Sequence, residues 1–244
     1  NETKYGTTAK TIRQTSRKVK MIRLFTLILT LFLAACEAVE SSRSLPYIGH
    51  YDLEYSIKDG LQVIDTVYQP VQSFTYQNQD GLQVTNKNYA NKVWITEFFF
   101  STCPTICPIM TVQMTKLFEE VNTMDKKDQV QFLSFSIDPE KDTPETLKKY
   151  KNLYCKNCKN WDFLTGDEKF THRLGIESFK IFAGREEEAE GGFAHSGAFS
   201  LVDTKGFLRG VYNITGFDGS VNNLEYYRLL EDLKVLLATN IDTH

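Results

Sequence analysis

The sequence predicts an α/β fold, in which helices flank a central mixed β-sheet, and three observations support this prediction. Residues 93–100 and 129–137 are apolar and rich in aromatic and β-branched side chains, as buried strands are. Residues 109–124 carry apolar side chains at close to helical spacing, and residues 142–145 (Asp-Thr-Pro-Glu) have the cap and proline of a helix start. Strand and helix patterns therefore alternate, which is the arrangement that buries a sheet between layers of helix.

Strand-like alternation also precedes the first of these core strands. Residues 51–76 alternate between apolar and polar side chains, and turn signals interrupt them at 58–60 and at 69–70. Residues 72–76 and 82–85 predict a second hairpin that leads into the main sheet. We therefore expect an N-terminal β-hairpin extension on the central fold.

The second half of the chain continues the alternation. We expect the helix that begins near Pro144 to run to about residue 153. The elements predicted after it are a short helix near 167–175, a strand around 179–182, a hairpin of 198–202 and 207–212, and a closing amphipathic helix over 224–237. The resulting order β-α-β-α-β-β-α is that of an α/β sandwich.

Two cysteines, Cys103 and Cys107, lie four residues apart between the first core strand and its helix. Each is followed by a proline, a residue that is tolerated in a first helical turn. We therefore expect Cys107 at or in the first turn. The partial positive charge of a helix N-terminus favours thiolate over thiol, which should lower a cysteine pKa from about 8.5. A cysteine motif that follows the first core strand and opens the first helix makes the predicted fold thioredoxin-like.

Thiolates of Cys103 and Cys107 that point the same way suit monovalent copper, zinc or a disulfide. A stable metal site needs a third ligand, and His195 is the candidate, because it directly precedes the predicted hairpin at 198–212. In a thioredoxin-like fold this point lies beside the cysteine loop, where ordinary thioredoxins carry a cis-proline; here no proline follows Pro144. The alternative is a structural disulfide or two buried cysteines. The other histidines lie in the tether, on a polar helix face and at the terminus: His50, His172 and His244.

A second pair, Cys155 and Cys158, forms a C-x-x-C motif after the predicted helix that starts at Pro144. A zinc knuckle would need two further ligands from another cysteine pair. A disulfide that pins this loop, a second redox pair and an accessory copper-binding pair remain open as interpretations.

These motifs together resemble those of the Sco/SenC family of copper chaperones, over roughly residues 70–240. The matching segments are Cys103-Pro104-Thr105-Ile106-Cys107-Pro108, Asp138-Pro139-Glu140-Lys141-Asp142-Thr143-Pro144, Trp161-Asp162-Phe163-Leu164, and His195-Ser196 followed by Leu201-Val202-Asp203. The resemblance implies that Cys103, Cys107 and His195 bind copper. It also implies a membrane-tethered protein that delivers copper to the copper-receiving subunit of cytochrome c oxidase, or reduces the cysteines of that subunit.

Three functions compete on this basis. The first is a copper metallochaperone, which is not an enzyme. The second is a thiol–disulfide reductase that acts on a partner's cysteines, with Cys103 and Cys107 as its redox-active pair and without obligatory copper. The third is a peroxidase of the peroxiredoxin kind, which Pro104 argues against, because the reactive cysteine of that class usually follows a threonine by three residues.

The N-terminal segment resembles an export signal. After Met21-Ile22-Arg23 comes an apolar run at 24–33, which is too short to span a membrane comfortably, and then Ala34-Ala35-Cys36. Residues 33–36 resemble a bacterial lipobox, in which the cysteine is lipidated and becomes the first residue of the mature chain. Met21 is then the expected start, with residues 1–20 a mis-extended reading frame. The alternative is a single uncleaved anchoring helix.

The predicted organisation is therefore a non-mature extension and lipoprotein-type signal peptide over 1–35, a polar tether over 36–50 and a thioredoxin-like domain over 51–244. We expect an exported lipoprotein anchored at Cys36 and facing the periplasm or cell exterior, where disulfides persist. Removing residues 1–35 takes seven of the 28 basic and one of the 31 acidic residues, which leaves a net charge of about −9. Nucleic acid is therefore not an expected partner.

Overall fold

The computed structural model describes residues 43–186, 192–216 and 218–239. These residues belong almost entirely to one compact unit that begins at Ser44. The predicted leader and Cys36 lie outside the described residues. Within the described part of the chain, no helix has both the length and the apolar character that crossing a bilayer requires.

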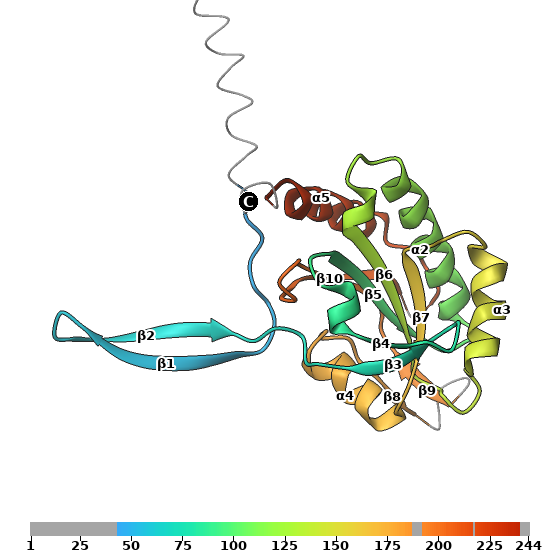
Figure 1. The fold of residues 1–244 in the computed structure, drawn as a ribbon, viewed down its shortest axis with the longest axis horizontal. Helices are drawn as coiled ribbons and strands as arrows, with labels where there is room; N and C mark the ends of the chain where they lie inside the picture. The colour runs from blue at the N-terminus through green and yellow to red at the C-terminus, as the bar shows by residue number, and fades with distance from the viewer. Residues whose placement is uncertain (1–42, 187–191, 217, 240–244) are drawn as a thin grey trace, which may run out of the picture. The chain divides into compact units, whose positions relative to one another are not determined.

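A seven-stranded mixed sheet forms the centre of this unit (Figure 1). Its three central strands run parallel, and the flanking hairpins pair antiparallel to them. Both β5 and β6 are buried at every position, which explains their continuous apolar runs. In order across the sheet the strands are β11 (Leu208–Thr215), β10 (Gly197–Val202), β5 (Val93–Phe99), β6 (Val130–Ser136), β7 (Trp161–Thr165), β3 (Thr75–Asn78) and β4 (Gln83–Thr85).

Helices cover both faces of the sheet. On one face the ring of Phe99 packs 5.3 Å from Tyr150 of α3, and on the other Phe98 packs 5.5 Å from Phe179, which follows α4. Helix α5 lies beside α2, where Tyr226 donates a hydrogen bond to Glu120 at 2.8 Å. The helices are α2 (Ile106–Asn122), α3 (Pro144–Tyr154), α4 (Glu168–Glu177) and α5 (Asn223–Thr239), with short 3₁₀ turns η1 (Asn86–Tyr89) and η2 (Lys127–Gln129).

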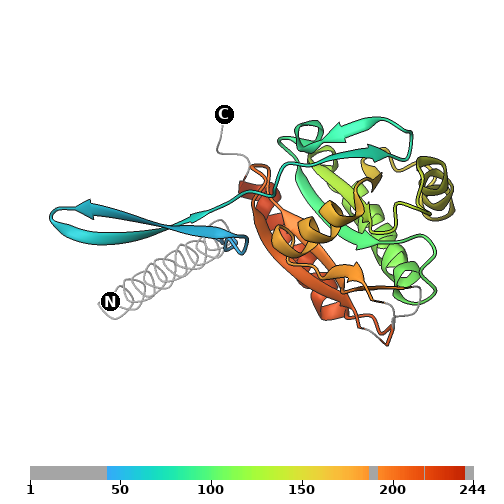
Figure 2. The same cartoon turned by 90° about the horizontal axis from the view of Figure 1, so that it is seen from below.

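The predicted N-terminal hairpin is present as a separate two-stranded sheet of β1 (Tyr51–Lys58) and β2 (Leu61–Tyr68) (Figures 1 and 2). Asp59 and Gly60 connect the strands with φ angles of +53° and +78°, as a tight two-residue hairpin turn requires. At the base of the hairpin, the Gln69 amide donates to the His50 carbonyl at 2.7 Å. The thioredoxin-like α/β fold with its hairpin extension is thus confirmed.

Two sequence predictions about the strands were wrong. Residues 179–182 are not a strand; Lys180 has a φ of +57°, and the strand β8 is Ala183–Arg185, paired antiparallel with β9 (Phe193–His195). The predicted order of elements also omitted β7, which is a central strand of the sheet. Its polar residue Asp162 interrupts the apolar pattern, and its partners are distant in the chain: Tyr89 donates to it at 2.9 Å and Gln79 at 3.1 Å.

Candidate metal centre

The cysteine loop runs from the end of β5 into the first turn of α2. Helix α2 begins at Ile106, three residues earlier than its apolar spacing predicts, so Cys107 lies in its first turn as expected. The Cys103 amide donates to the Phe100 carbonyl at 3.2 Å, which bends the loop back. The Cys107 amide, one of the N–H groups that a helix start leaves unpaired, points at the Cys103 sulfur at 3.5 Å.

Both cysteines are thiols, and both are buried, with exposed fractions of 6% for Cys103 and 1% for Cys107. Burial raises the pKa of the Cys107 thiol well above its usual value, and the adjacent Cys103 and nearby Glu97 raise it further. The Phe100 amide opposes this effect without overcoming it. The expectation that the helix start would lower the pKa is therefore corrected, because loss of hydration outweighs the hydrogen bond from the Phe100 backbone.

Glu97 lies in the middle of β5 and is fully buried. Ser134 donates to one of its oxygens at 2.7 Å, while the other, Oε2, has no hydrogen-bond partner among the described residues. Burial raises the pKa of Glu97 to about 7. Sequence reasoning passed over this carboxyl group, although a charged residue inside an otherwise apolar strand was the signal for it.

Asp142 holds the other side of the cysteine loop. Its carboxylate accepts hydrogen bonds from the Ser101 amide at 3.1 Å, from the Ser101 hydroxyl and from the Ser136 hydroxyl. Burial raises the pKa of Asp142, and the hydrogen bonds from the two serines oppose that change. The next residue, Thr143, caps α3 by accepting from the Thr146 amide at 3.3 Å. The loop and the start of α3 are therefore fastened to each other.

His195 is the last residue of β9, and its backbone pairs with Ala183 of β8. Two residues earlier, the ring of Phe193 packs 5.3 Å from that of Phe100, which directly precedes the cysteine loop. The fold thus brings β9 next to the end of β5. The side chain of His195 lies outside what the structure describes. Among the side chains that it does describe, no three from Cys, His, Asp and Glu are grouped to hold a metal.

His172 of α4 was expected on a polar helix face, but it is half-buried. Its Nε2 lies 3.2 Å from the Ile137 carbonyl oxygen, and its ring centroid is 6.1 Å from that of Phe193. The side chain therefore links the end of β6 to β9. Helical spacing alone carries no signal of such a contact.

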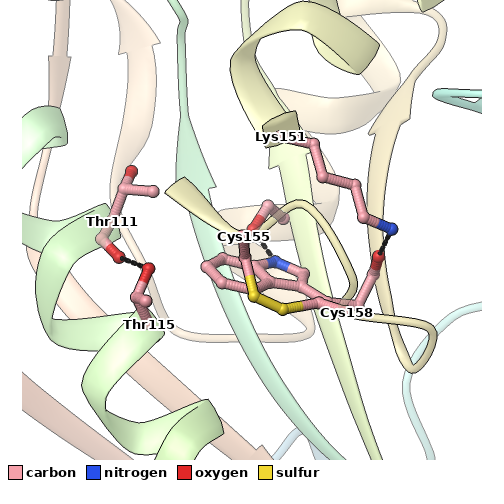
Figure 3. Close-up of a disulfide and its surroundings, with 7 residues drawn as sticks. Thr111, Thr115, Lys151, Cys155 and Cys158 are labelled. Carbon is pink, nitrogen blue, oxygen red and sulfur yellow. Dashed lines mark hydrogen bonds between the residues drawn. A yellow bond between two sulfur atoms is a disulfide. The ribbon is translucent and has the colours of Figure 1, made fainter. Parts of the chain in front are cut away.

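The second cysteine pair is a disulfide between Cys155 and Cys158 (Figure 3). A bonded pair agrees both with a disulfide that pins the loop and with a second redox pair. Cys155 caps the C-terminal end of α3, whereas Asp142 and Thr143 precede the opposite end of that helix. The disulfide therefore lies at the C-terminal end of α3, whereas the loop of Cys103 and Cys107 is held near its N-terminal end through Ser101 and Asp142.

Fold and site together define a thioredoxin-like protein with a buried pair of thiols at the start of its first core helix. The family model described as SCO1/SenC matches residues 65–221. The SCO1 protein homolog of Bacillus subtilis (strain 168) is 36% identical over 176 residues, which cover 72% of this chain and 86% of that protein. A protein of Stutzerimonas stutzeri, described as a putative copper-binding protein, is 33% identical over 119 residues, or 48% of this chain and 56% of its own. The chain belongs to the SCO1/SenC family.

Solved structures agree with this assignment. A SCO1/SenC family lipoprotein from Bacillus anthracis str. Ames is 32% identical, with a TM-score of 0.60 over 69% of this chain and 95% of that chain. BsSco is 34% identical, with a TM-score of 0.58 over 71% and 95% of the two chains. BsSco is described as having a disulfide switch and as a member of the Sco family of cytochrome c oxidase assembly proteins. Copper-bound yeast Sco1, at 21% identity and a TM-score of 0.52 over 68% and 89% of the two chains, shows the shared fold.

Proposed function

We propose that this protein is a copper metallochaperone that acts outside the cytoplasm in the assembly of cytochrome c oxidase. The observation that carries the proposal is that Cys103 and Cys107 are both buried and lie close together. The Cys107 amide donates to the Cys103 sulfur. Two soft sulfur ligands in a site with little access to water suit monovalent copper. The copper-binding description of one relative and the oxidase-assembly description of another point the same way.

In this proposal copper is cargo, and His195 supplies the third ligand. Strand β9 reaches the end of β5 through Phe193 and Phe100, so its last residue is well placed to complete the site. Copper binding has to displace the protons of both thiols. Since burial raises the pKa of Cys107, loading releases protons and becomes tighter as the pH rises.

The cellular placement is part of the same proposal. Residues 21–35 act as an export leader, Cys36 carries the lipid anchor and residues 36–50 tether the domain to the membrane. The copper-receiving subunit of cytochrome c oxidase is the partner, which takes either copper or reducing equivalents. The description of the B. anthracis relative as a lipoprotein supports the anchor.

The second candidate function is thiol–disulfide exchange at the same pair. It is favoured by the close approach of the two residues, in which the Cys107 amide donates to the Cys103 sulfur at 3.5 Å. A Cys103–Cys107 disulfide would form with the loss of two electrons and two protons, and it would remove both copper ligands. Under this function His195 is dispensable.

Anaerobic titration of the reduced protein with monovalent copper, against a competing chelator, distinguishes the two functions. We expect one equivalent to bind, and His195→Ala to weaken binding about 10- to 100-fold, because a two-sulfur site lacks its third donor. The matched control is His50→Ala, an exposed histidine that should leave affinity unchanged. Equal affinities for wild type and His195→Ala would contradict the assigned ligand set. No stoichiometric binding at all would favour the reductase.

A further inference from the structure

We propose that Cys155–Cys158 is a second thiol–disulfide exchange centre, which accepts electrons from a dithiol carried by an acidic partner. The proposal does not depend on copper or on Cys103 and Cys107. It concerns the disulfide at the C-terminal end of α3 (Figure 3). It also concerns the cleft whose wall includes Cys158.

The loop that carries the disulfide is held at its helical end by contacts that do not involve sulfur. The Cys155 amide donates to the Lys151 carbonyl at 2.7 Å, and the Lys151 amino group donates to the Trp161 carbonyl. The rings of Tyr150 and Tyr154 pack with their centroids 4.9 Å apart. The end of α3 therefore stays attached to β7 when the S–S bond is broken.

The other end of the loop is held in the same way. Asn160 donates through its side chain to the Val130 carbonyl at 3.0 Å, and its own carbonyl accepts from the Phe132 amide at 2.8 Å. A disulfide that closes so short a loop removes less entropy from the unfolded chain than one that closes a long loop. The bond therefore supplements contacts that already hold the loop, which leaves it available for exchange.

The two cysteines differ in exposure, as the two ends of an exchange centre do. Cys155 is only partly buried, whereas Cys158 is 3% exposed and belongs to the apolar core. Cys155 is therefore the residue that an attacking thiolate meets, and Cys158 is the leaving group.

The cleft beside the disulfide is strongly basic. It has a volume of about 380 Å³, and Cys158 is part of its wall. The charged residues that line it are four lysines and one aspartate: Lys148, Lys151, Lys156, Lys159 and Asp80. Asp80 is already paired with Lys148 at 3.0 Å. The whole chain carries a net charge of −3, so this excess of positive charge is local and complements an acidic partner.

The exchange needs only the partner's dithiol and the Cys155–Cys158 disulfide. A thiolate of the partner attacks the Cys155 sulfur, the Cys155–Cys158 bond breaks, and Cys158 leaves as a thiolate in the wall of the lysine-lined cleft. The partner's second thiolate then attacks the mixed disulfide and releases Cys155. The partner ends as a disulfide, and Cys155 and Cys158 have gained two electrons and two protons.

The test uses the full chain with Cys36→Ser, Cys103→Ser and Cys107→Ser, so that the second pair holds its only remaining cysteines. The probes are two synthetic Cys-x-x-Cys peptides, one flanked by glutamates and one by lysines, and maleimide mass labelling reports the reduction of Cys155–Cys158. We expect the acidic peptide to react at least about 10-fold faster at low salt, with the difference shrinking at high salt. Lys156→Gln with Lys159→Gln should remove most of this preference, and Lys87→Gln with Lys205→Gln, a control pair of exposed lysines elsewhere, should keep it.

Equal rates for the two peptides, or a disulfide that millimolar dithiothreitol does not reduce in the folded protein, would overturn the proposal. Peptide mapping of the wild-type protein after labelling repeats the measurement without any substitution, because it resolves residues 155 and 158 from residues 103 and 107. A charge preference at 155 and 158 in that experiment supports the proposal even where a variant fails to fold.

Discussion

The two cysteine pairs of this protein differ in their surroundings, although Cys158 is buried in the apolar core as Cys103 and Cys107 are. Cys103 and Cys107 lie at the start of a helix, in an apolar interior with a buried carboxyl group beside them. Cys155 and Cys158 lie at the end of a helix, beside a cleft lined with lysines. The first pair are thiols and the second pair are a disulfide. The surroundings of a cysteine pair, and not its spacing alone, therefore decide what chemistry its sulfur atoms can do.

The largest expected effect separates the pairs by copper affinity. Cys103→Ser or Cys107→Ser should weaken monovalent copper binding by at least about 1,000-fold, or about 4 kcal/mol, because a hydroxyl group is a poor ligand for a soft ion. Cys155→Ser with Cys158→Ser should change affinity by less than about threefold. Chelator competition measures both. Loss of the bound equivalent in the second variant would show that the pairs act together.

The side chains beside the two cysteine pairs should also differ in how much they contribute to the stability of the fold. Asp142→Ala removes the hydrogen bonds that hold Ser101 and Ser136, and we expect it to lower the free energy of unfolding by about 4 kcal/mol. Asp80→Ala, at the exposed ion pair of the basic cleft, should cost less than about 0.5 kcal/mol. Urea unfolding measures both values. Similar costs for the two substitutions would mean that Asp142 does not brace the loop.

The stability of the region around Cys107 should depend on pH through Glu97. Burial raises the pKa of Glu97 from 4.5 to about 7. Between these values the folded protein keeps a proton that the unfolded chain has released, so the free energy of unfolding falls as the pH rises from about 4.5 to about 7. The total change corresponds to about 3 kcal/mol, and Glu97→Gln should remove it.

Urea unfolding at several pH values between 4.5 and 8 checks this prediction. Glu145→Gln, at an exposed glutamate, is the control and should keep the slope of the wild type. An unchanged slope in Glu97→Gln would show that the carboxyl group is ionised in the folded protein.

The smallest expected effect concerns the disulfide itself. Cys155→Ala with Cys158→Ala should lower the free energy of unfolding by about 2 kcal/mol, as the entropy of a four-residue loop predicts. The melting temperature should fall by about 4 to 8 °C, and calorimetry measures it. A far larger loss would mean that the bond is a main structural support, which would weaken the contrast between the two pairs.

Prediction from the sequence succeeded for elements whose structure is determined by residues within one short segment. The continuous apolar runs of β5 and β6, the Asp59-Gly60 turn and the cap at Thr143 are local patterns, and each led to the observed element. Prediction failed where a partner far along the chain was needed. Strand β7 was missed because Asp162 breaks its apolar pattern, and its hydrogen bonds come from Tyr89 and Gln79, which are distant in the chain.

The same division holds for the site. The spacing and prolines of the motif were enough to place Cys107 in the first turn of a helix and Cys103 just before it, because helix starts follow local rules. Three features of the site depended on packing between segments that lie far apart in the chain. They are the high pKa of Cys107, the hydrogen bond from Ser101 to Asp142, and the ring contact between Phe193 and Phe100. Hydration and long-range contacts are properties of the assembled fold, so no local pattern could have encoded them.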